Sequence, residues 1–444
     1  MWRGRRRSWL ASVAVGLASA LALSACGGGS SETEDPLSLT GKFDWRRYEG
    51  EEIRFVAGKT AWQALIDDAK LKRFEDLTGI HVNMEALPED QFRQRLQVEL
   101  TSGSSDIDVF MSSVLQDGRR FHSSGWYEDL TPYVTNPTLT APDYNFEDFS
   151  KSVIEGHSFD GELIGLPVML ETQMLFYRKD ILDKHGLEVP KTFAELEKTA
   201  KAIDNAGDGV YGFSARGARA AAVTQLSSFL YNHGADYVDE EGKAAFNTPE
   251  GRRAFELYGR LVREYGPPGA ANNSWEELLP LFQQGKLALW ADNSGQAAQA
   301  IDPKNSRVAD SVGFAPMPAG PAGSSQTFFS WALAMSSQSE KKGPAWYFIQ
   351  WATSPEMVEA VQKEGVAGGR QSVPFGPDVP EDFVETFRSS LQKARPQLPP
   401  VRSVPEVRDV IGEAIVTSIQ GGNLDAALTK AADEFDRIVA AEGN

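Results

Sequence analysis

Hydrophobic positions in residues 53–111 alternate between the periods of strands and helices. Residues 53–56 are rich in β-branched and aromatic side chains, residues 80–84 alternate apolar and polar positions, and residues 107–111 form a third apolar run. These three patterns predict strands. Between them, the apolar positions of residues 62–77 and 92–100 recur at helical spacing. The order strand–helix–strand–helix–strand predicts a parallel sheet with helices on its faces.

The loops that follow the first and third predicted strands are the first candidates for a ligand site. Ligands of open α/β sheets bind at the carboxyl ends of the strands. Lys59 and Thr60 follow the first strand, and Gln116 and Asp117 lie in the loop after the third. Asp117 could instead pair with one of the two arginines that follow it.

A second block of helices and strands follows. Residues 166–177 form a strand-like run, residues 287–291 read as a buried strand, and residues 424–438 carry the apolar stripe of a helix. Thr192 with Glu195, and Ser274 with Glu277, form capping boxes that open helices. A chain of 444 residues exceeds the roughly 250–300 residues that one hydrophobic core supports, so at least two lobes are expected.

Composition and charge exclude several classes of function. The chain is 41% apolar and 24% charged, which is ordinary for a globular protein. Its formal net charge of −18 argues against nucleic acid as a partner, because phosphate binding needs a basic face. A single cysteine allows no internal disulfide and no cysteine metal site.

The first 25 residues predict an export signal. Arg3 to Arg7 form a positive segment, and Trp9 to Leu23 form an apolar run that is short for a membrane span. The run ends in Leu23-Ser24-Ala25-Cys26, which resembles a bacterial lipobox. The alternative is an ordinary signal peptide in which Cys26 is incidental. We therefore expect lipidation at Cys26, a flexible tether over residues 26–50, and a protein held on the outer face of the cytoplasmic membrane.

Motifs of enzyme chemistry are weak in this sequence. Residues 207–212 match G-x-G-x-x-G, but a helical segment precedes them and a strand-like run overlaps them, so a glycine-rich turn is the simpler interpretation. Residues 212–216 lack the last glycine of a nucleophile elbow. Asp106 and Asp108 share a strand face, as paired carboxylates do in glycosidases, but chance proximity is common in an acidic chain. The five histidines have no i, i+4 partner, so no metal and no cofactor are predicted.

Four segments resemble the extracellular solute-binding proteins of sugar ABC importers. Residues 74–82 (F-E-D-L-T-G-I-H-V) resemble the family's F-E-x-x-T-G-I-x-V, and residues 107–131 its D-V-x-x…G-x-L-x-D-L-T. Residues 165–193 resemble G-L-P…Y-Y-N-K-D-L…P-K-T-W, with Arg178 in place of Asn, and residues 348–354 resemble F-I-x-W-x-x-S.

Two further stretches, residues 274–286 and 330–334, are similar to the sorbitol/mannitol-binding branch of this family. Related branches bind other mono- and oligosaccharides, so the resemblance does not identify the ligand.

The resemblance implies a periplasmic-binding-protein-like fold of type II: two α/β lobes, each a mainly parallel sheet flanked by helices, with the ligand cleft between them. It implies crossings near residues 165–172, 313–318 and 353–370. Residues 51–166 with 317–353 are then expected to form lobe 1, and residues 167–316 with 354–444 to form lobe 2.

The resemblance and the strand pattern add five candidate ligand contacts. Glu171 lies in the first crossing, Trp290 and Asp292 share a strand face, Trp331 precedes a small-residue strand, and Arg370 follows a Gly-rich turn. Carboxylates accept hydrogen bonds from hydroxyls, arginine donates, and an aromatic ring covers the C–H face of a sugar. Each of these residues could equally have a core or surface role.

The expected function is the capture of a sugar or sugar alcohol and its delivery to the membrane permease of an ABC importer, by a monomer without enzymatic activity. A secreted carbohydrate-active enzyme that uses cleft carboxylates is the alternative from another class. A structural or adhesive surface lipoprotein is a third.

Overall fold

The computed structural model describes residues 35–149, 151–392 and 394–442. The predicted signal segment and Cys26 lie outside these residues. Among the helices of the described residues, none combines the length and the apolar character that a membrane crossing requires.

One nine-stranded sheet runs through the described body, in the order β2-β1-β3-β10-β6-β8-β7, with β11 beside β10 and β9 beside β6. A separate two-stranded hairpin consists of β4 and β5. The strands are β1 (Glu52–Gly58), β2 (His81–Leu87), β3 (Val109–Ser112), β4 (Ser158–Phe159), β5 (Glu162–Leu163), β6 (Leu166–Arg178), β7 (Tyr211–Ser214), β8 (Leu287–Asn293), β9 (Val312–Pro316), β10 (Thr327–Met335) and β11 (Arg395–Pro396).

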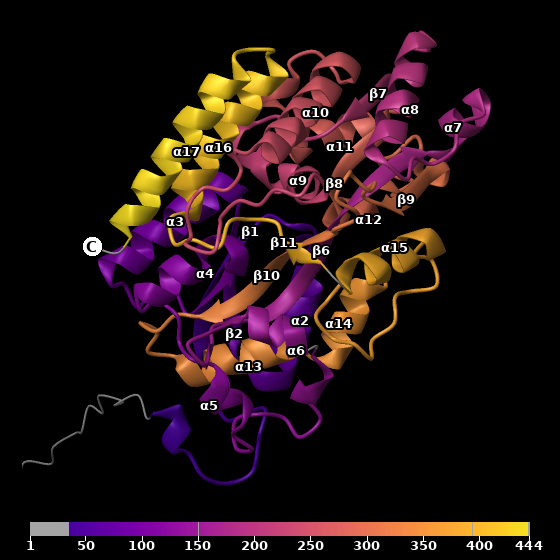
Figure 1. Ribbon diagram of the computed structural model, residues 1–444. Helices are drawn as coiled ribbons and strands as arrows, with labels where there is room; N and C mark the ends of the chain where they lie inside the picture. Colours follow the sequence, from indigo (N-terminus) through magenta and orange to yellow (C-terminus); the bar gives the residue numbers. More distant parts are fainter. Residues whose placement is uncertain (1–34, 150, 393, 443–444) are drawn as a thin grey trace, which may run out of the picture. The chain divides into compact units, whose positions relative to one another are not determined.

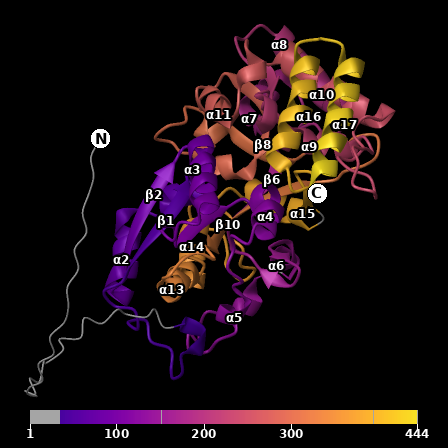
Figure 2. The ribbon, with the colours of Figure 1, turned by 90° about the vertical axis from the view of Figure 1, so that its left-hand side faces the viewer.

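Helices cover both ends of this sheet (Figures 1 and 2). Those around β1, β2, β3 and β10 are α1 (Ala61–Leu65), α2 (Asp68–Thr78), α3 (Glu89–Ser102), α4 (Val114–Ser123), α5 (Thr131–Val134), α6 (Lys151–Gly156), α13 (Lys342–Ala352) and α14 (Pro355–Gln362). Those around β7, β8 and β9 are α7 (Lys179–His185), α8 (Phe193–Asn205), α9 (Arg219–Asn232), α10 (Pro249–Tyr265), α11 (Trp275–Gln283), α12 (Ala297–Ala300), α15 (Glu381–Leu391), α16 (Val404–Ile419) and α17 (Leu424–Ala441). Short 3₁₀ turns are η1 (Pro36–Ser38), η2 (Phe146–Asp148), η3 (Ala270–Asn272), η4 (Ser294–Gln296) and η5 (Ala309–Ser311).

The predicted parallel unit is confirmed in the first lobe, where β1 pairs in parallel with both β2 and β3. The single helix predicted over residues 62–77 is wrong, because the structure divides it into α1 and α2. Asp67 caps α2 by accepting a hydrogen bond from the Lys70 amide, and this extended cap residue interrupts the helix. Gly79 ends α2 in the left-handed conformation, at φ 74°.

The expectation of mainly parallel strands fails in the second lobe. There β6 runs antiparallel to both β8 and β9, and only β7 and β8 are parallel. The reason is the path of the chain: β6 enters the second lobe directly from the first and so runs opposite to β7, β8 and β9. Both predicted capping boxes are formed, at the starts of α8 and α11. The glycine-rich stretch 207–212 forms the turn after α8 and the first two residues of β7.

Three segments of the chain meet where the two lobes join. The first part of β6, up to Thr172, pairs with β10, and its second part, from Gln173, pairs with β8 and β9. Phe328 at the start of β10 lies between Thr172 and Pro396 of β11. We call the point where β6, β10 and β11 meet the crossing point.

Residues 35–50 differ from the expected flexible tether, because they pack against the first lobe. The rings of Phe43, Trp45 and Tyr48 surround Tyr347, with centroid distances of 4.9–5.5 Å. The Tyr347 hydroxyl donates to the Asp44 carbonyl at 2.9 Å. The folded body therefore includes residues 35–50.

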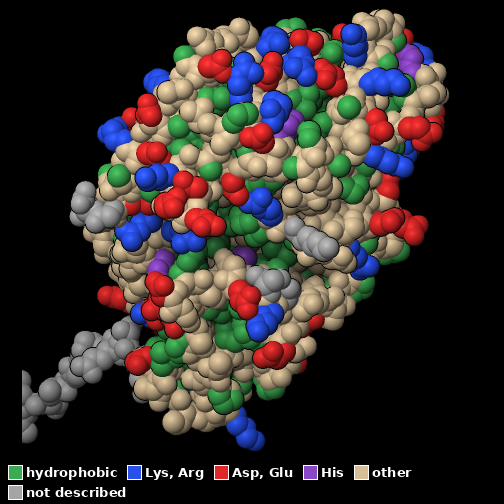
Figure 3. All heavy atoms as spheres, viewed as in Figure 1, with side chains coloured by type: hydrophobic (Ala, Val, Ile, Leu, Met, Phe, Trp, Pro, Cys, Tyr) green, Lys and Arg blue, Asp and Glu red, His purple; other side chains and the backbone are tan. Residues whose placement is uncertain are grey.

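The face of the molecule seen in Figure 3 shows basic and acidic side chains interspersed. That face carries no continuous basic area of the kind that binds a phosphate backbone.

Candidate ligand-binding site

A small cavity lies beside the crossing point and takes its walls from both lobes. Its volume is about 60 Å³, which gives room for a few water molecules. The lining residues are Lys59, Thr60, Ala61, Glu89, Gln116, Met169, Glu171, Arg216, Thr224, Trp275, Asn293, Gly295, Gln296, Gln299, Phe329, Trp331 and Arg408.

One face of the sheet at β6 and β10 forms the floor of this cavity. Phe329 pairs with Glu171 across the two strands, and Trp331 pairs with Met169. These four residues share a face because alternate side chains of a strand point the same way. The register shifts directly after Trp331, and such an irregularity re-aims neighbouring side chains.

The first lobe supplies the loop after β1 and the first turn of α4. Lys59 and Thr60 line the cavity as predicted, and Thr60 also caps α1 by accepting from the Gln63 amide at 3.1 Å. Gln116 lines it too, but from a helix and not from the predicted loop, because α4 begins at Val114.

Asp117 lies behind the cavity wall and is not among the residues that line it. Its carboxylate accepts from the Arg93 guanidinium at 2.7 Å, so its ion-pair partner is Arg93 and not a neighbouring arginine. Burial raises the pKa of Asp117, although Arg93 opposes the shift. Arg93 also binds Glu89 at 2.8 Å and lies over the Trp331 ring at 5.2 Å from its centroid. Asp117 thereby helps to hold Arg93 against the aromatic floor.

Glu171 brings a nearly buried carboxylate to the cavity. Its side chain lies directly against Gly295, where an added Cβ would come within 2.1 Å of the carboxylate oxygen. A side chain at residue 295 would therefore push the end of the Glu171 side chain out of its place. Burial raises the pKa of Glu171 to about 7, with Arg216 opposing the shift and Asp292 and Glu89 reinforcing it.

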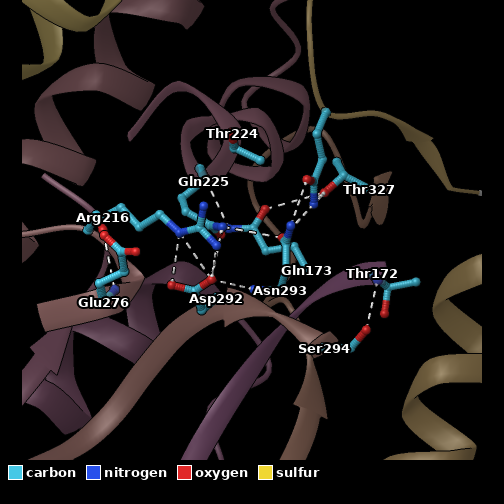
Figure 4. Close-up of polar contacts among 12 residues, drawn as sticks. Thr172, Gln173, Arg216, Thr224, Gln225, Glu276, Asp292, Asn293, Ser294 and Thr327 are labelled. Carbon is cyan, nitrogen blue, oxygen red and sulfur yellow. Dashed lines mark hydrogen bonds and ion pairs between the residues drawn. The ribbon is translucent and has the colours of Figure 1, made fainter. Parts of the chain in front are cut away.

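Arg216 and Asp292 form the charged pair of the second lobe. The Arg216 guanidinium donates to Asp292 from Nε at 3.1 Å and from Nη2 at 2.5 Å, as Figure 4 shows. Burial would lower the pKa of Arg216, but Asp292 and Glu171 outweigh it, and the pKa is raised. Asp292 is fully buried and does not line the cavity. Asp292 was predicted as a ligand contact, but it instead holds Arg216 in the cavity wall. Arg216 was not among the predicted contacts.

Arg408 of α16 joins the two lobes across the cavity. Its guanidinium donates to Gln116 Oε1 in the first lobe, and to the Ala220 carbonyl (3.0 Å) and Thr224 Oγ1 (3.3 Å) in the second. Burial and the nearby positive charge of Arg93 lower the pKa of Arg408 to about 10.

Gln296 offers a polar atom that has no partner within the described part of the chain. Its side chain lines the cavity, and its Oε1 is buried without a hydrogen bond. Buried polar groups are nearly always hydrogen-bonded, so an acceptor left open in a cavity wall points to a ligand hydroxyl or to water.

Two further predicted contacts, like Asp117 and Asp292, do not line the cavity. Trp290 is fully buried and packs on Phe176 and Phe282, at centroid distances of 4.8 and 5.5 Å. The shared-face argument misplaced it because both faces of β8 are covered. Arg370 is buried elsewhere in the fold, where it donates to the carbonyls of Thr353 and Tyr144 at 2.7 and 2.8 Å. Its role is structural.

Comparison with known proteins identifies the class. The model of the bacterial extracellular solute-binding protein family matches residues 56–359, and the chain belongs to this family. Membership of a family of extracellular binding proteins implies an extracytoplasmic location and a protein that binds its solute without converting it.

Particular relatives narrow the comparison. The chain is 30% identical to a mannitol-binding protein of Pseudomonas aeruginosa over 344 residues, which is 75% of this chain and 77% of that one. It is 29% identical to an erythritol/L-threitol-binding protein of Mycolicibacterium smegmatis over 394 residues, 83% of this chain and 82% of that one.

Among solved structures, a solute-binding protein from Agrobacterium vitis S4 with bound D-mannitol is 27% identical, with a TM-score of 0.75, covering 88% of this chain and 99% of that one. A ribitol complex from Agrobacterium radiobacter K84 shares the fold, at 24% identity and a TM-score of 0.80, over 88% of this chain and 99% of that one.

Proposed function

We propose that this protein binds a small sugar alcohol or monosaccharide in the cavity at the crossing point and delivers it to the permease of an ABC importer. The observation that carries the proposal is the composition of the cavity wall. Carboxylate, guanidinium and amide groups from both lobes converge beside the aromatic rings of Phe329 and Trp331. Such a wall suits a compact ligand with many hydroxyl groups.

The size of the cavity favours one short ligand over an oligosaccharide. About 60 Å³ accommodates a few water molecules, which the hydroxyls of a short polyol would replace. The names of the relatives point the same way, since they bind mannitol and erythritol or threitol, and one related structure holds D-mannitol.

We infer that the ligand is captured by closure of the lobes. Support comes from the Arg408–Gln116 hydrogen bond, which joins the lobes, and from β6, which pairs with strands of both. A ligand that contacts both walls favours the closed arrangement, because it binds that state better than the open one. The proposed lobes are residues 51–166 with 317–353, and 167–316 with 354–444, with the exception of α14 and Arg370, which pack against the first lobe.

The proposal includes anchoring at the outer face of the cytoplasmic membrane through Cys26. It rests on the resemblance of Leu23-Ser24-Ala25-Cys26 to a lipobox and on the extracellular family. The protein acts as a monomer in this proposal.

A thermal-shift and calorimetry screen tests the proposed ligand class. The chain from residue 27 onward is titrated with erythritol, ribitol, D-mannitol, glucose and maltose. Binding to the native state raises its melting temperature by mass action. We expect stabilisation by at least one polyol, a weaker effect of maltose, and chemically unchanged ligand on recovery. Stabilisation by maltose alone would contradict the small-ligand proposal, and no stabilisation by any of the five would contradict the proposed ligand class.

A further inference from the structure

A cluster of amide and hydroxyl side chains is buried at the crossing point, and only Asn293 among its members lines the cavity. Each member is at most 3% exposed. We call it the amide cluster; its members are Gln173 of β6, Gln225 and Ser228 of α9, Asn293 of β8, Thr327 of β10, and Gln397 directly after β11.

Gln173 holds one side of the amide cluster together. Its Oε1 accepts from Ser228 Oγ at 2.5 Å and from Thr327 Oγ1 at 3.3 Å. Its Nε2 donates to the Gln225 carbonyl at 2.9 Å. Figure 4 shows Gln173 lying close to Asn293 and Thr327.

Gln397 holds the other side. Its Nε2 donates to Asn293 Oδ1 at 2.9 Å and to Thr327 Oγ1 at 3.3 Å. Its Oε1 accepts from Asn293 Nδ2 at 3.2 Å. Gln397 and Asn293 therefore exchange hydrogen bonds in both directions, and 104 residues separate them in the chain.

The amide cluster reaches the cavity through Asn293, which lines it. Gln225 Nε2 donates to Asn293 Oδ1 at 3.2 Å and to Asp292 Oδ1 at 3.4 Å. Asp292 in turn holds Arg216, whose side chain lines the cavity. A second link is the Thr172 amide, which donates to Ser294 Oγ at 3.1 Å. Hydrogen bonds thus connect the cavity wall to the crossing point (Figure 4).

Each of the three segments that meet at the crossing point contributes one member: Gln173 from β6, Thr327 from β10, and Gln397 from the residues after β11. A rotation of one lobe changes the backbone of these segments first, because they connect the lobes. A buried amide that loses its partners is costly, so the cluster favours discrete arrangements of the lobes over a continuous range.

We propose that Gln397 is a positioning residue for ligand-driven closure. Its hydrogen bonds fix Asn293 of the cavity wall relative to Thr327 of β10. Occupancy of the cavity is thereby coupled to the angle between the lobes. This inference rests on the proposed function. Gln397 touches no ligand, since it does not line the cavity, so its effect on affinity must pass through Asn293 and Thr327.

The test replaces Gln397 by methionine, which has a similar volume and cannot replace the amide hydrogen bonds. The matched control is Gln350→Met. Gln350 is 1% exposed and makes two comparable bonds, to the Leu139 carbonyl at 2.8 Å and from the Ala141 amide at 2.9 Å. It does not line the cavity. Both variants lose buried hydrogen bonds and should lower the melting temperature.

The readouts that separate positioning from stability are the dissociation constants for D-mannitol and erythritol and the ligand-induced change in radius of gyration in solution scattering. For Gln397→Met we expect an affinity about tenfold weaker and a smaller change in radius. For Gln350→Met we expect wild-type values for both. Equal affinities in the two variants would overturn the inference. If Gln397→Met does not fold, Gln397→Asn takes its place, because it keeps an amide that is one methylene too short.

A third measurement works without any ligand. Hydrogen exchange at the backbone amides of residues 293–296 and 327–331 should be faster in Gln397→Met than in the wild type, and unchanged in Gln350→Met. If the wild type binds neither polyol, the proposed ligand class is wrong. The exchange experiment then still tests whether Gln397 restrains the cavity wall and β10. Unchanged exchange in Gln397→Met would overturn the inference.

Discussion

Glu171 offers the sharpest test of the site, because its raised pKa links ligand binding to stability. Burial raises this pKa to about 7 in the folded protein, compared with an ordinary value of about 4.3 when unfolded. Between these two values the folded state binds one proton more than the unfolded state. The free energy of unfolding therefore falls as pH rises from about 4.5 to 7, and changes no further above pH 7 through this group.

The magnitude follows from the size of the shift. A difference of about 2.7 pKa units, at about 1.4 kcal/mol per unit, makes the ionised carboxylate cost about 3.5–4 kcal/mol above pH 7. Glu171→Gln removes this cost while keeping the shape of the side chain against Gly295. We expect the ligand-free variant to equal the wild type near pH 4.5 and to be more stable by up to about 3.5–4 kcal/mol at pH 8.

Ligand binding should change in the opposite direction. An ionised Glu171 would accept charge-assisted hydrogen bonds from ligand hydroxyls, worth about 1.5–3 kcal/mol each. The loss of one such bond in Glu171→Gln weakens binding about tenfold to a hundredfold at pH 8. A gain in stability combined with a loss of affinity is the expected signature of a residue kept for function.

The assay is urea unfolding at pH 5, 6, 7 and 8, with calorimetric titration of D-mannitol and erythritol at pH 8. Glu364→Gln is the control, because Glu364 is exposed and does not line the cavity. A stability difference between Glu171→Gln and the wild type that is the same at all four pH values would refute the reasoning about the pKa. Unchanged affinity at pH 8 would refute the assignment of Glu171 to the ligand site.

Three further predictions test the remaining assignments. Trp290→Ala should lower the free energy of unfolding by about 3–5 kcal/mol in a urea titration, and the folded fraction should keep its affinity for the ligand. A loss of affinity without a loss of stability would show that the Trp290 ring contacts the ligand. Arg408→Met removes the bond to Gln116 and should weaken polyol binding about tenfold or more in calorimetry, whereas unchanged binding would show that the lobes close without it. Cys26→Ala should move the protein from the membrane fraction to the soluble fraction without changing its affinity, and equal membrane retention would contradict the proposed anchor.

The sequence was most informative where local pattern determines structure. The alternation of periods in residues 53–111 predicted the parallel pairing of β1 with β2 and β3, and the two capping boxes marked the starts of α8 and α11. Lys59 and Gln116 line the cavity because the carboxyl ends of neighbouring parallel strands necessarily meet at one edge of the sheet.

The rest of the cavity wall depends on contacts between distant segments. Arg216 and Arg408 come from a loop and a helix that only the tertiary fold brings together, and no local period distinguishes them from surface arginines. Trp290 and Trp331 both lie in apolar strands. Only the packing on each face decides that Trp290 enters the core while Trp331 lines the cavity.

The packing of residues 35–50 on the first lobe also limits how far the proposed lipid anchor could let the protein move. With Phe43, Trp45 and Tyr48 held around Tyr347, residues 26–34 alone would connect a lipidated Cys26 to residues 35–50. Such a stretch spans at most about 30 Å, about a third of the span available to residues 26–50. A shorter tether raises the effective concentration of the binding protein at a membrane partner. A ligand-bound protein on this tether would diffuse within a thin layer above the bilayer. Its rate of encounter with the permease would then depend little on the bulk concentration of the binding protein.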